Sequence, residues 1–144
     1  MKLRILAIGK PKLRYAADGI SEFQKRLKRS CPVEITYLKD KDDSRSLLDK
    51  SAGSYRIALD ERGARLTTGQ LVTRVNALEQ RGDVKTVTFL IGGADGHSAE
   101  LRDQSDLVLS LSPLTMQHEL ALVVLLEQLY RVFSIKRGEP YHRP

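Results

Sequence analysis

Hydrophobic and polar residues form two kinds of pattern along this chain. Short apolar runs, often rich in β-branched residues, predict five strands, at 2–9, 33–38, 55–59, 86–91 and 107–111. Between them, apolar residues recur every three or four positions and predict helices that begin near residue 14, cover 44–51, begin at 67 and near 98, and cover 117–133. Strands that alternate with helices in this way predict a single α/β domain over residues 1–144, with a largely parallel sheet.

The residues that flank the predicted helices indicate where two of them begin. Thr67 and Gln70 have the spacing of a capping box, in which the two side chains satisfy free backbone N–H groups. Ser44 is the expected N-cap of the short helix 44–51. The third strand is expected to end at Leu59 and to run into Asp60-Glu-Arg-Gly63.

The last predicted helix has no polar residue on any face between Leu120 and Leu126. A helix that is apolar all round must be buried on all sides, whereas a terminal helix on a small sheet usually exposes one face. A partner subunit, most simply in a two-fold dimer, resolves this conflict. Complete burial in the chain's own core is the alternative.

Three strand ends carry residues that suit a ligand site. They are Leu59-Asp60, the glycine-rich loop 91–96 and the segment 111–115. In a parallel sheet, ligands collect beyond the carboxyl ends of the strands, and glycine allows a backbone to approach a flat ligand closely. The glycine loop has neither the Gly-Lys-Ser/Thr ending of a P-loop nor a full G-x-G-x-x-G. Taken alone, it describes a tight turn equally well.

The segment Ser110–Thr115 combines hydroxyl groups, a proline and apolar side chains. This combination suits a slot for an adenine ring, with Leu111 and Leu114 packed against the ring faces. An ordinary proline-stiffened helix entry, with Thr115 as a cap, is the other interpretation of these residues.

Positive charge gathers at the two ends of the chain. Residues 1–31 hold nine Lys and Arg against two acidic residues, and residues 128–144 hold four against one, within a net charge of +6. Basic termini on an acidic middle indicate an anionic partner, most economically nucleic acid, or else a solvated helix face. The tail 136–144 adds a tyrosine that can stack on a base and a histidine, but a frayed basic tail has the same composition.

Several classes of protein are excluded by composition. No apolar run approaches the length of a membrane-spanning helix, and the apolar stretch Ile5–Ile8 is too short for a signal-peptide core. The single cysteine, Cys31, excludes an internal disulfide and fits a reducing compartment, so a cytoplasmic location is expected. Three scattered histidines and one cysteine give no metal cluster.

Five segments, taken in order, resemble the RlmH family of SPOUT-class methyltransferases. They are KLRILAIGK, IALDERGARLTT, FLIGGADGHSAEL, LSLSPLTMQHELALVVLLEQLYRVFSI and the ending GEPYHR. The resemblance covers essentially the whole chain, and its most specific parts are the LLEQLYR helix and the terminal PYHR. Members of this family methylate N3 of a pseudouridine in large-subunit (23S) ribosomal RNA.

The resemblance implies more than the residue patterns do. It implies a SPOUT-type α/β knot, in which the C-terminal stretch threads through a loop, a homodimer, and S-adenosylmethionine (SAM) as cofactor. The residues that match the family's cofactor site are Leu59, Gly92, Leu111, Ser112, Pro113, Leu114, Thr115 and Met116, and those that match its active site are Tyr141, His142, Arg143 and His118. Two departures, Ala94 and Gln117 in place of frequent family prolines, affect how rigid the cofactor loops are.

The implied chemistry assigns a role to each residue of the tail. N3 of a pseudouridine is a weakly acidic imide, so a general base assists its attack on the methyl group. His142 is the first choice for that base, with Arg143 stabilising the developing anion and holding phosphate, and Tyr141 packing or stacking. Lys25, Arg26, Lys28 and Arg29 of the first helix are expected to attract RNA in a salt-dependent way. Whether the tail acts within its own subunit or in the partner's is left open.

Two other classes of function fit parts of the pattern. A non-catalytic RNA-binding module explains the basic termini, but it gives no reason for three converging loops. A nucleotide hydrolase would need a lysine or a metal-binding pair of carboxylates beside the glycine loop, and the sequence offers neither. Binding of SAM separates a methyltransferase from the RNA-binding module.

Overall fold

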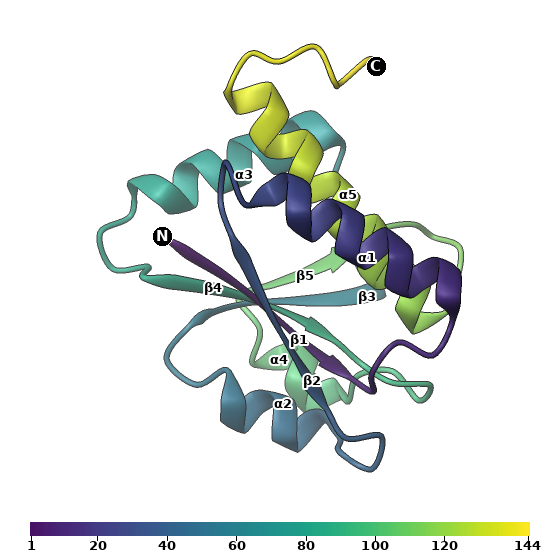
Figure 1. Ribbon diagram of the computed structural model, residues 1–144. Helices are drawn as coiled ribbons and strands as arrows, with labels where there is room; N and C mark the ends of the chain where they lie inside the picture. The colour runs from purple at the N-terminus through teal and green to yellow at the C-terminus, as the bar shows by residue number, and fades with distance from the viewer.

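The computed structural model describes residues 1–144 as a five-stranded sheet covered by helices on both faces (Figure 1). The strands are β1 (Lys2–Ile8), β2 (Val33–Leu38), β3 (Tyr55–Arg65), β4 (Thr86–Ile91) and β5 (Leu107–Ser110). The helices are α1 (Arg14–Leu27), α2 (Ser44–Lys50), α3 (Thr68–Gln80), α4 (Ala99–Asp103) and α5 (His118–Lys136). The predicted alternation of strands and helices is confirmed, and every strand pairing is parallel.

The strand order, β2-β1-β4-β3-β5, determines which loops meet. Strands β4, β3 and β5 are consecutive in the sheet, so their carboxyl ends lie side by side at one edge. The three loops that the sequence singled out follow these three strands. Because all strands are parallel, the fold brings these loops together at one end of the sheet.

Two hydrophobic cores lie on opposite faces of the sheet. Helices α1, α3 and α5 cover one face, and α2 and α4 cover the other (Figure 1). The core under α1, α3 and α5 contains 20 buried apolar residues, against 8 in the core under α2 and α4. The larger core holds α5 against the sheet. That the C-terminal stretch threads through a loop stays a prediction.

The helix starts agree with the sequence in one case and correct it in another. Thr67 caps α3 with the full capping box to Gln70, as predicted. The prediction that Ser44 caps α2 is wrong, because the N-cap is Asp43, whose carboxylate accepts from Arg45 N and Ser46 N at 3.1 and 3.3 Å. The Ser44 hydroxyl instead accepts from the N–H of Ser98 at 2.9 Å, which joins α2 to the start of α4.

Strand β3 continues beyond Leu59, where the sequence pattern predicted its end. Leu59 and Ala64 both pair with Leu109 of β5, so residues 60–63 bulge out of the sheet between them. Gly63 makes this bulge possible, because a Cβ there would lie 2.4 Å from the carbonyl oxygen of Val108. The bulge projects acidic and basic side chains toward the loops that follow β4 and β5.

Helix α5 is buried mainly within its own subunit. Leu122, Leu125, Leu126 and Leu129 are each at most 2% exposed, in the core between α5, α1 and the sheet. Burial in the chain's own core therefore explains three residues of the apolar run, Leu122, Leu125 and Leu126. Ala121, Val123 and Val124 are half-buried, and Leu120 at the start of the helix is exposed.

The start of α5 is joined to the start of α1 by a buried carboxylate. Glu119 is 5% exposed, and its Oε1 accepts from the backbone N–H groups of Lys12 and Leu13 at 2.7 and 2.9 Å. Burial alone would raise the pKa of Glu119, but the hydrogen bonds from Leu13, Lys12 and Gln117 together lower it below 4.5. A lowered pKa means that the ionised carboxylate stabilises the folded state.

Replacing Glu119 with glutamine is expected to destabilise the protein by about 1–3 kcal/mol near neutral pH, because charge-assisted hydrogen bonds are weakened. The stabilisation by the carboxylate is fully present above the unfolded pKa near 4.5 and is lost as pH falls through the lower folded pKa. Urea unfolding at pH 7 and at pH 3 measures this, and the difference between the two proteins should shrink at pH 3. Asp18→Asn, at an exposed position of α1, is the control.

Candidate functional site

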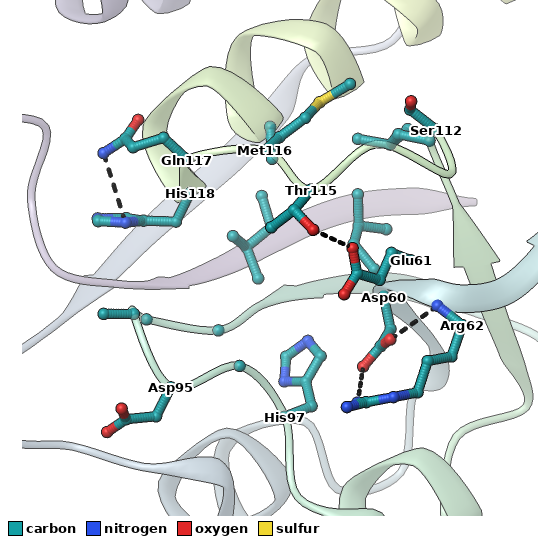
Figure 2. Close-up of a pocket in the computed structure, with 18 of the residues that line it drawn as sticks. Asp60, Glu61, Arg62, Asp95, His97, Ser112, Thr115, Met116, Gln117 and His118 are labelled. Carbon is teal, nitrogen blue, oxygen red and sulfur yellow. Dashed lines mark hydrogen bonds and ion pairs between the residues drawn. The ribbon is translucent and has the colours of Figure 1, made fainter.

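A pocket of about 550 Å³ lies where the three loops meet (Figure 2). Its walls come from the β3 bulge, the glycine loop after β4, and the segment between β5 and α5. The lining residues are Leu59–Arg62, Ile91–His97, Leu111, Ser112, Leu114–His118 and Ala121. The predicted crevice is therefore one continuous cavity.

Hydrogen bonds within the segment after β5 fix the shape of one wall. The hydroxyl of Ser110 donates to the carbonyl oxygen of Ser112, and the Ser112 hydroxyl accepts from the N–H of Leu114, both at 2.9 Å. These bonds turn the chain tightly around Pro113. The wall facing it is the glycine loop, where a Cβ on Gly92 would lie 3.0 Å from the backbone of Gly96. Glycine is therefore needed for the loop to close on itself.

The pocket is acidic although the protein is basic. Asp60, Glu61 and Asp95 line it, against the single cation Arg62. Asp60 is neutralised, because its carboxylate lies 3.6 Å from Arg62 and 3.5 Å from Arg102. Glu61 has no cation within ion-pair distance and accepts instead from the hydroxyl of Thr115, which joins the β3 bulge to the opposite wall (Figure 2). The free carboxylates Glu61 and Asp95 favour a ligand that carries positive charge.

His97 is a buried histidine at the pocket that sequence reasoning missed. Its Nε2 donates to the carbonyl oxygen of Leu90 at 3.0 Å, and its Nδ1 is buried with no partner. Burial lowers the pKa of His97, against an opposing effect of the Leu90 carbonyl, so the ring is neutral at pH 7. A lone histidine after a glycine loop gave no signal in the sequence.

The structure brings most of the expected cofactor residues together. Seven of the eight line the pocket, and Pro113 alone does not, although it shapes the loop. His118 lines the same pocket at the start of α5, with its ring beside the Gln117 side chain (Figure 2). The side chains of Asp60, Glu61, Arg62, Asp95 and His97 add to the predicted set.

The expected active-site tail does not reach this pocket. Tyr141, His142 and Arg143 follow the far end of α5, where the chain terminates (Figure 1). The pocket is lined by residues at the start of α5. The tail contacts α5 at Glu127, Tyr130 and Arg131, and Glu127 lies six residues, or about 9 Å along the helix axis, beyond Ala121 at the pocket. Within one subunit, the structure therefore separates the two groups of residues that the resemblance assigns to one active site.

The tail is pinned to its own helix rather than frayed. The hydroxyl of Tyr141 donates to Glu127 at 3.2 Å, its ring packs edge-on against Tyr130 at 4.6 Å, and Arg131 lies 4.8 Å from its ring centre. Arg131 also pairs with Glu127 at 3.2 Å and contacts Nδ1 of His142 at 3.1 Å. Burial, followed by the nearby charge of Glu127, raises the pKa of Tyr141, so this hydroxyl keeps its proton.

The contact with Arg131 determines the tautomer of His142. An arginine side chain can only donate, so Nδ1 of His142 accepts and the neutral ring carries its hydrogen on Nε2. This hydrogen bond holds the ring in one orientation. Arg131 has Glu127 as a second partner, so it can release Nδ1 without losing all its contacts.

Comparison with known proteins agrees with this architecture. The family described as "Predicted SPOUT methyltransferase" matches residues 1–142. A ribosomal RNA large subunit methyltransferase H of Thermus thermophilus is 47% identical over 144 residues, which cover 100% of both chains. The tRNA (m1G37) methyltransferase from Aquifex aeolicus has a TM-score of 0.58 at 16% identity, covering 100% of this chain and 77% of that chain.

A Legionella pneumophila protein solved with the bound cofactor SAM has a TM-score of 0.55 at 13% identity, covering 91% of this chain and 66% of that chain. At such low identities, the two solved structures support the fold alone. The sequence matches extend further, because they run the length of the chain, and they confirm the resemblance seen in its motifs. This chain belongs to the SPOUT methyltransferase family, within the group of ribosomal RNA large subunit methyltransferase H proteins.

Proposed function

We propose that this protein transfers a methyl group from SAM to N3 of a pseudouridine in large-subunit ribosomal RNA, and that its substrate is the assembled ribosome. The observation that carries the proposal is the full-length match, at 47% identity, to a ribosomal RNA large subunit methyltransferase H. The three-loop pocket supplies a place for the cofactor. The site of action is the cytoplasm, where ribosomes work.

The pocket fits SAM in size, charge and available backbone. Its volume of about 550 Å³ lies within the usual range for sites that enclose a small molecule. When bound, SAM supplies a methyl group made electrophilic by a positively charged sulfonium, and Glu61 and Asp95 match that charge. Leu59, Gly92 and the segment 111–116 would hold the cofactor, with Leu111 and Leu114 against the adenine.

The residues of the tail act on the nucleophile. N3 of the pseudouridine must lose its proton before it attacks, and His142 accepts that proton. Because Nε2 carries the ring hydrogen, the accepting atom is Nδ1, after Arg131 turns from it toward Glu127. Arg143 then stabilises the negative charge that develops on the pseudouridine ring. Tyr141 anchors the tail to α5.

A homodimer is needed to join the tail to a pocket. Leu13, Leu114 and Leu120 are large, exposed apolar side chains, and they come from the segments around the pocket end of α5. Such a group supports a partner subunit at this end. In a two-fold dimer in which the α5 helices run in opposite directions, the tail of one subunit reaches the pocket of the other. The active site is then completed in trans.

Mixed dimers test this arrangement directly. A subunit with Gly92→Val, whose pocket is blocked, is paired with a subunit with His142→Ala, whose tail is inactive. If the site forms in trans, one intact tail faces one intact pocket, and we expect about half of the wild-type methylation rate. Differently tagged subunits are co-expressed, and the mixed dimer is purified and assayed.

The reciprocal pair is the control for this experiment. A doubly substituted subunit paired with a wild-type subunit should be inactive if the site forms in trans. It should retain about half of the activity if the site forms within one subunit. Activity of the reciprocal pair alone would therefore contradict the trans arrangement.

The function itself is tested by transfer of labelled methyl from SAM to large ribosomal subunits and to naked large-subunit RNA. We expect label in RNA, at N3 of a pseudouridine once the modified nucleotide is mapped. Calorimetry with SAM alone provides a second criterion. A pure dimer that binds no SAM and transfers no methyl group would favour an RNA-binding module without catalysis.

A further inference from the structure

A second cleft lies at the opposite end of the molecule from the cofactor pocket. It has a volume of about 210 Å³ and is formed between the second half of α1 and the end of α5. Its lining residues are Glu22, Lys25, Arg26, Arg29, Tyr130, Arg137 and Glu139. Four cations, two carboxylates and one aromatic ring thus come together from segments more than 100 residues apart in sequence. The roles proposed for the cofactor site and for Tyr141, His142 and Arg143 do not account for this cluster.

Two of the four cations are held in place by other side chains. Arg26 pairs with Glu22 at 3.3 Å and lies 5.6 Å from the ring centre of Tyr130. Arg137 pairs with Glu139 at 3.1 Å and donates to the hydroxyl of Ser30 at 2.8 Å. Both carboxylates of the cleft are therefore engaged by arginines, and these contacts fix the direction of the two guanidinium groups.

The other two cations have no acidic partner. Neither Lys25 nor Arg29 forms an ion pair or a side-chain hydrogen bond, and both are exposed at the mouth of the cleft. The cleft therefore carries an excess of two positive charges. Guanidinium and ammonium groups arranged around an open cleft bind phosphate oxygens through charge-assisted hydrogen bonds.

The position of the cleft indicates which phosphate it binds. Tyr130 forms part of its wall, and the ring of Tyr141 packs against the same Tyr130 at 4.6 Å. The cleft therefore adjoins Tyr141 through this aromatic pair. The two basic ends of the sequence also meet here, because the last residues of α1 face the last residues of α5. His142 lies close by, because it contacts Arg131, the residue that follows Tyr130 of the cleft wall.

We infer that this cleft binds a backbone phosphate of the substrate RNA next to the nucleotide that is methylated, and so sets the position of that nucleotide relative to the tail. The inference rests on the proposed function. It adds to the proposed RNA substrate a specific point at which the protein contacts it. The open mouth and the exposed cations favour a phosphate within a chain over an enclosed free anion. Lys25 and Arg29 supply the charge, and Arg26 and Arg137 supply the fixed geometry.

The test uses the double variant Lys25→Gln/Arg29→Gln in the full-length dimer. Both side chains are exposed and unpaired, so their replacement leaves the fold intact. Affinity for naked large-subunit RNA and for large ribosomal subunits is measured between 50 and 200 mM KCl. We expect roughly tenfold weaker binding at low salt, and a slope of log K against log salt that is smaller by about 2, since each lost phosphate contact removes about 1.

The matched control is Lys41→Gln/Lys50→Gln, which removes two exposed cations near α2, on the other face of the sheet. It changes the net charge equally and should leave the slope nearly unchanged. In methylation assays, the cleft variant should raise KM for RNA while kcat at saturating RNA and KM for SAM stay at wild-type values. An equal effect of the two double variants would overturn the inference, because general charge attraction would then explain the binding.

Two further measurements distinguish an RNA phosphate site from a subunit interface and from a free-anion site. If the cleft variant becomes monomeric by sedimentation, the cleft is a subunit interface and the inference fails. If calorimetry shows that inorganic phosphate binds to the wild type and not to the variant, while the salt dependence of RNA binding is unchanged, the cleft binds a free anion instead. Failure of the proposed function can be told apart from failure of this inference, because in that case the wild-type dimer would not bind SAM.

Discussion

Replacing His142 with alanine is expected to slow single-turnover methylation by about 10²–10⁴-fold, the range for losing a general base. The reason is that N3 of the pseudouridine then loses its proton only to solvent. The rate of the variant should therefore rise with pH between 6 and 9, while the wild-type rate levels off. Rapid-quench measurements with labelled SAM and large ribosomal subunits give both profiles.

The control for this variant is Pro144→Ala, which alters the exposed end of the same tail. It should keep the wild-type pH profile. SAM affinity, measured by calorimetry, should be the same in all three proteins, because the residues that would hold the cofactor do not include the tail. If the His142→Ala protein kept the full rate across the whole pH range, the role of His142 as base would be ruled out.

Replacing Gly63 with alanine is expected to disturb both stability and cofactor binding. The new Cβ would lie 2.4 Å from the carbonyl oxygen of Val108 and 2.8 Å from the nitrogen of Leu109, so β3 or β5 must move. Overpacking of this kind costs about 1–3 kcal/mol. The movement displaces Glu61 and the segment after β5, which form two walls of the pocket. We expect a Tm lower by several degrees and at least roughly tenfold weaker SAM binding.

Gly82→Ala is the matched control, because nothing lies within 4 Å of a Cβ at that position. Thermal unfolding and calorimetry on the three proteins measure both effects. Unchanged SAM affinity in the Gly63→Ala protein, with a normal Tm, would show that the β3 bulge does not shape the pocket.

Much of the fold could be predicted because local pattern and tertiary packing agree. The apolar run Thr86–Ile91 is a central strand, and the Thr67 capping box begins α3 as expected. The bulge of β3 could not be predicted, because residues 60–63 leave the sheet only through the shared pairing of Leu59 and Ala64 with Leu109. That pairing is a contact with a distant strand, and it leaves no periodic trace in the sequence.

The location of the candidate site, where three loops meet, could be predicted from the sequence. The roles of several of its side chains could not. Parallel strands end at one edge, so three unusual loops after three strands indicated one pocket. His97 was missed because its importance comes from burial, with an unpartnered Nδ1, and not from a motif. The state of the tail was equally hidden, since composition cannot show that Tyr141 and His142 are pinned by Glu127 and Arg131, eleven or more residues earlier.

Helix α5 has the pocket at its start, and the tail that follows its end is held against its middle turns, at Glu127, Tyr130 and Arg131. In a two-fold dimer with trans sites, one helix sets the spacing of both catalytic centres at once. Deleting a single residue within the helix would turn the tail by about 100° and draw it in by about 1.5 Å. The same deletion would occur in both subunits, so neither centre would be spared. In such a dimer, the length of helix α5 is therefore constrained by catalysis as well as by packing.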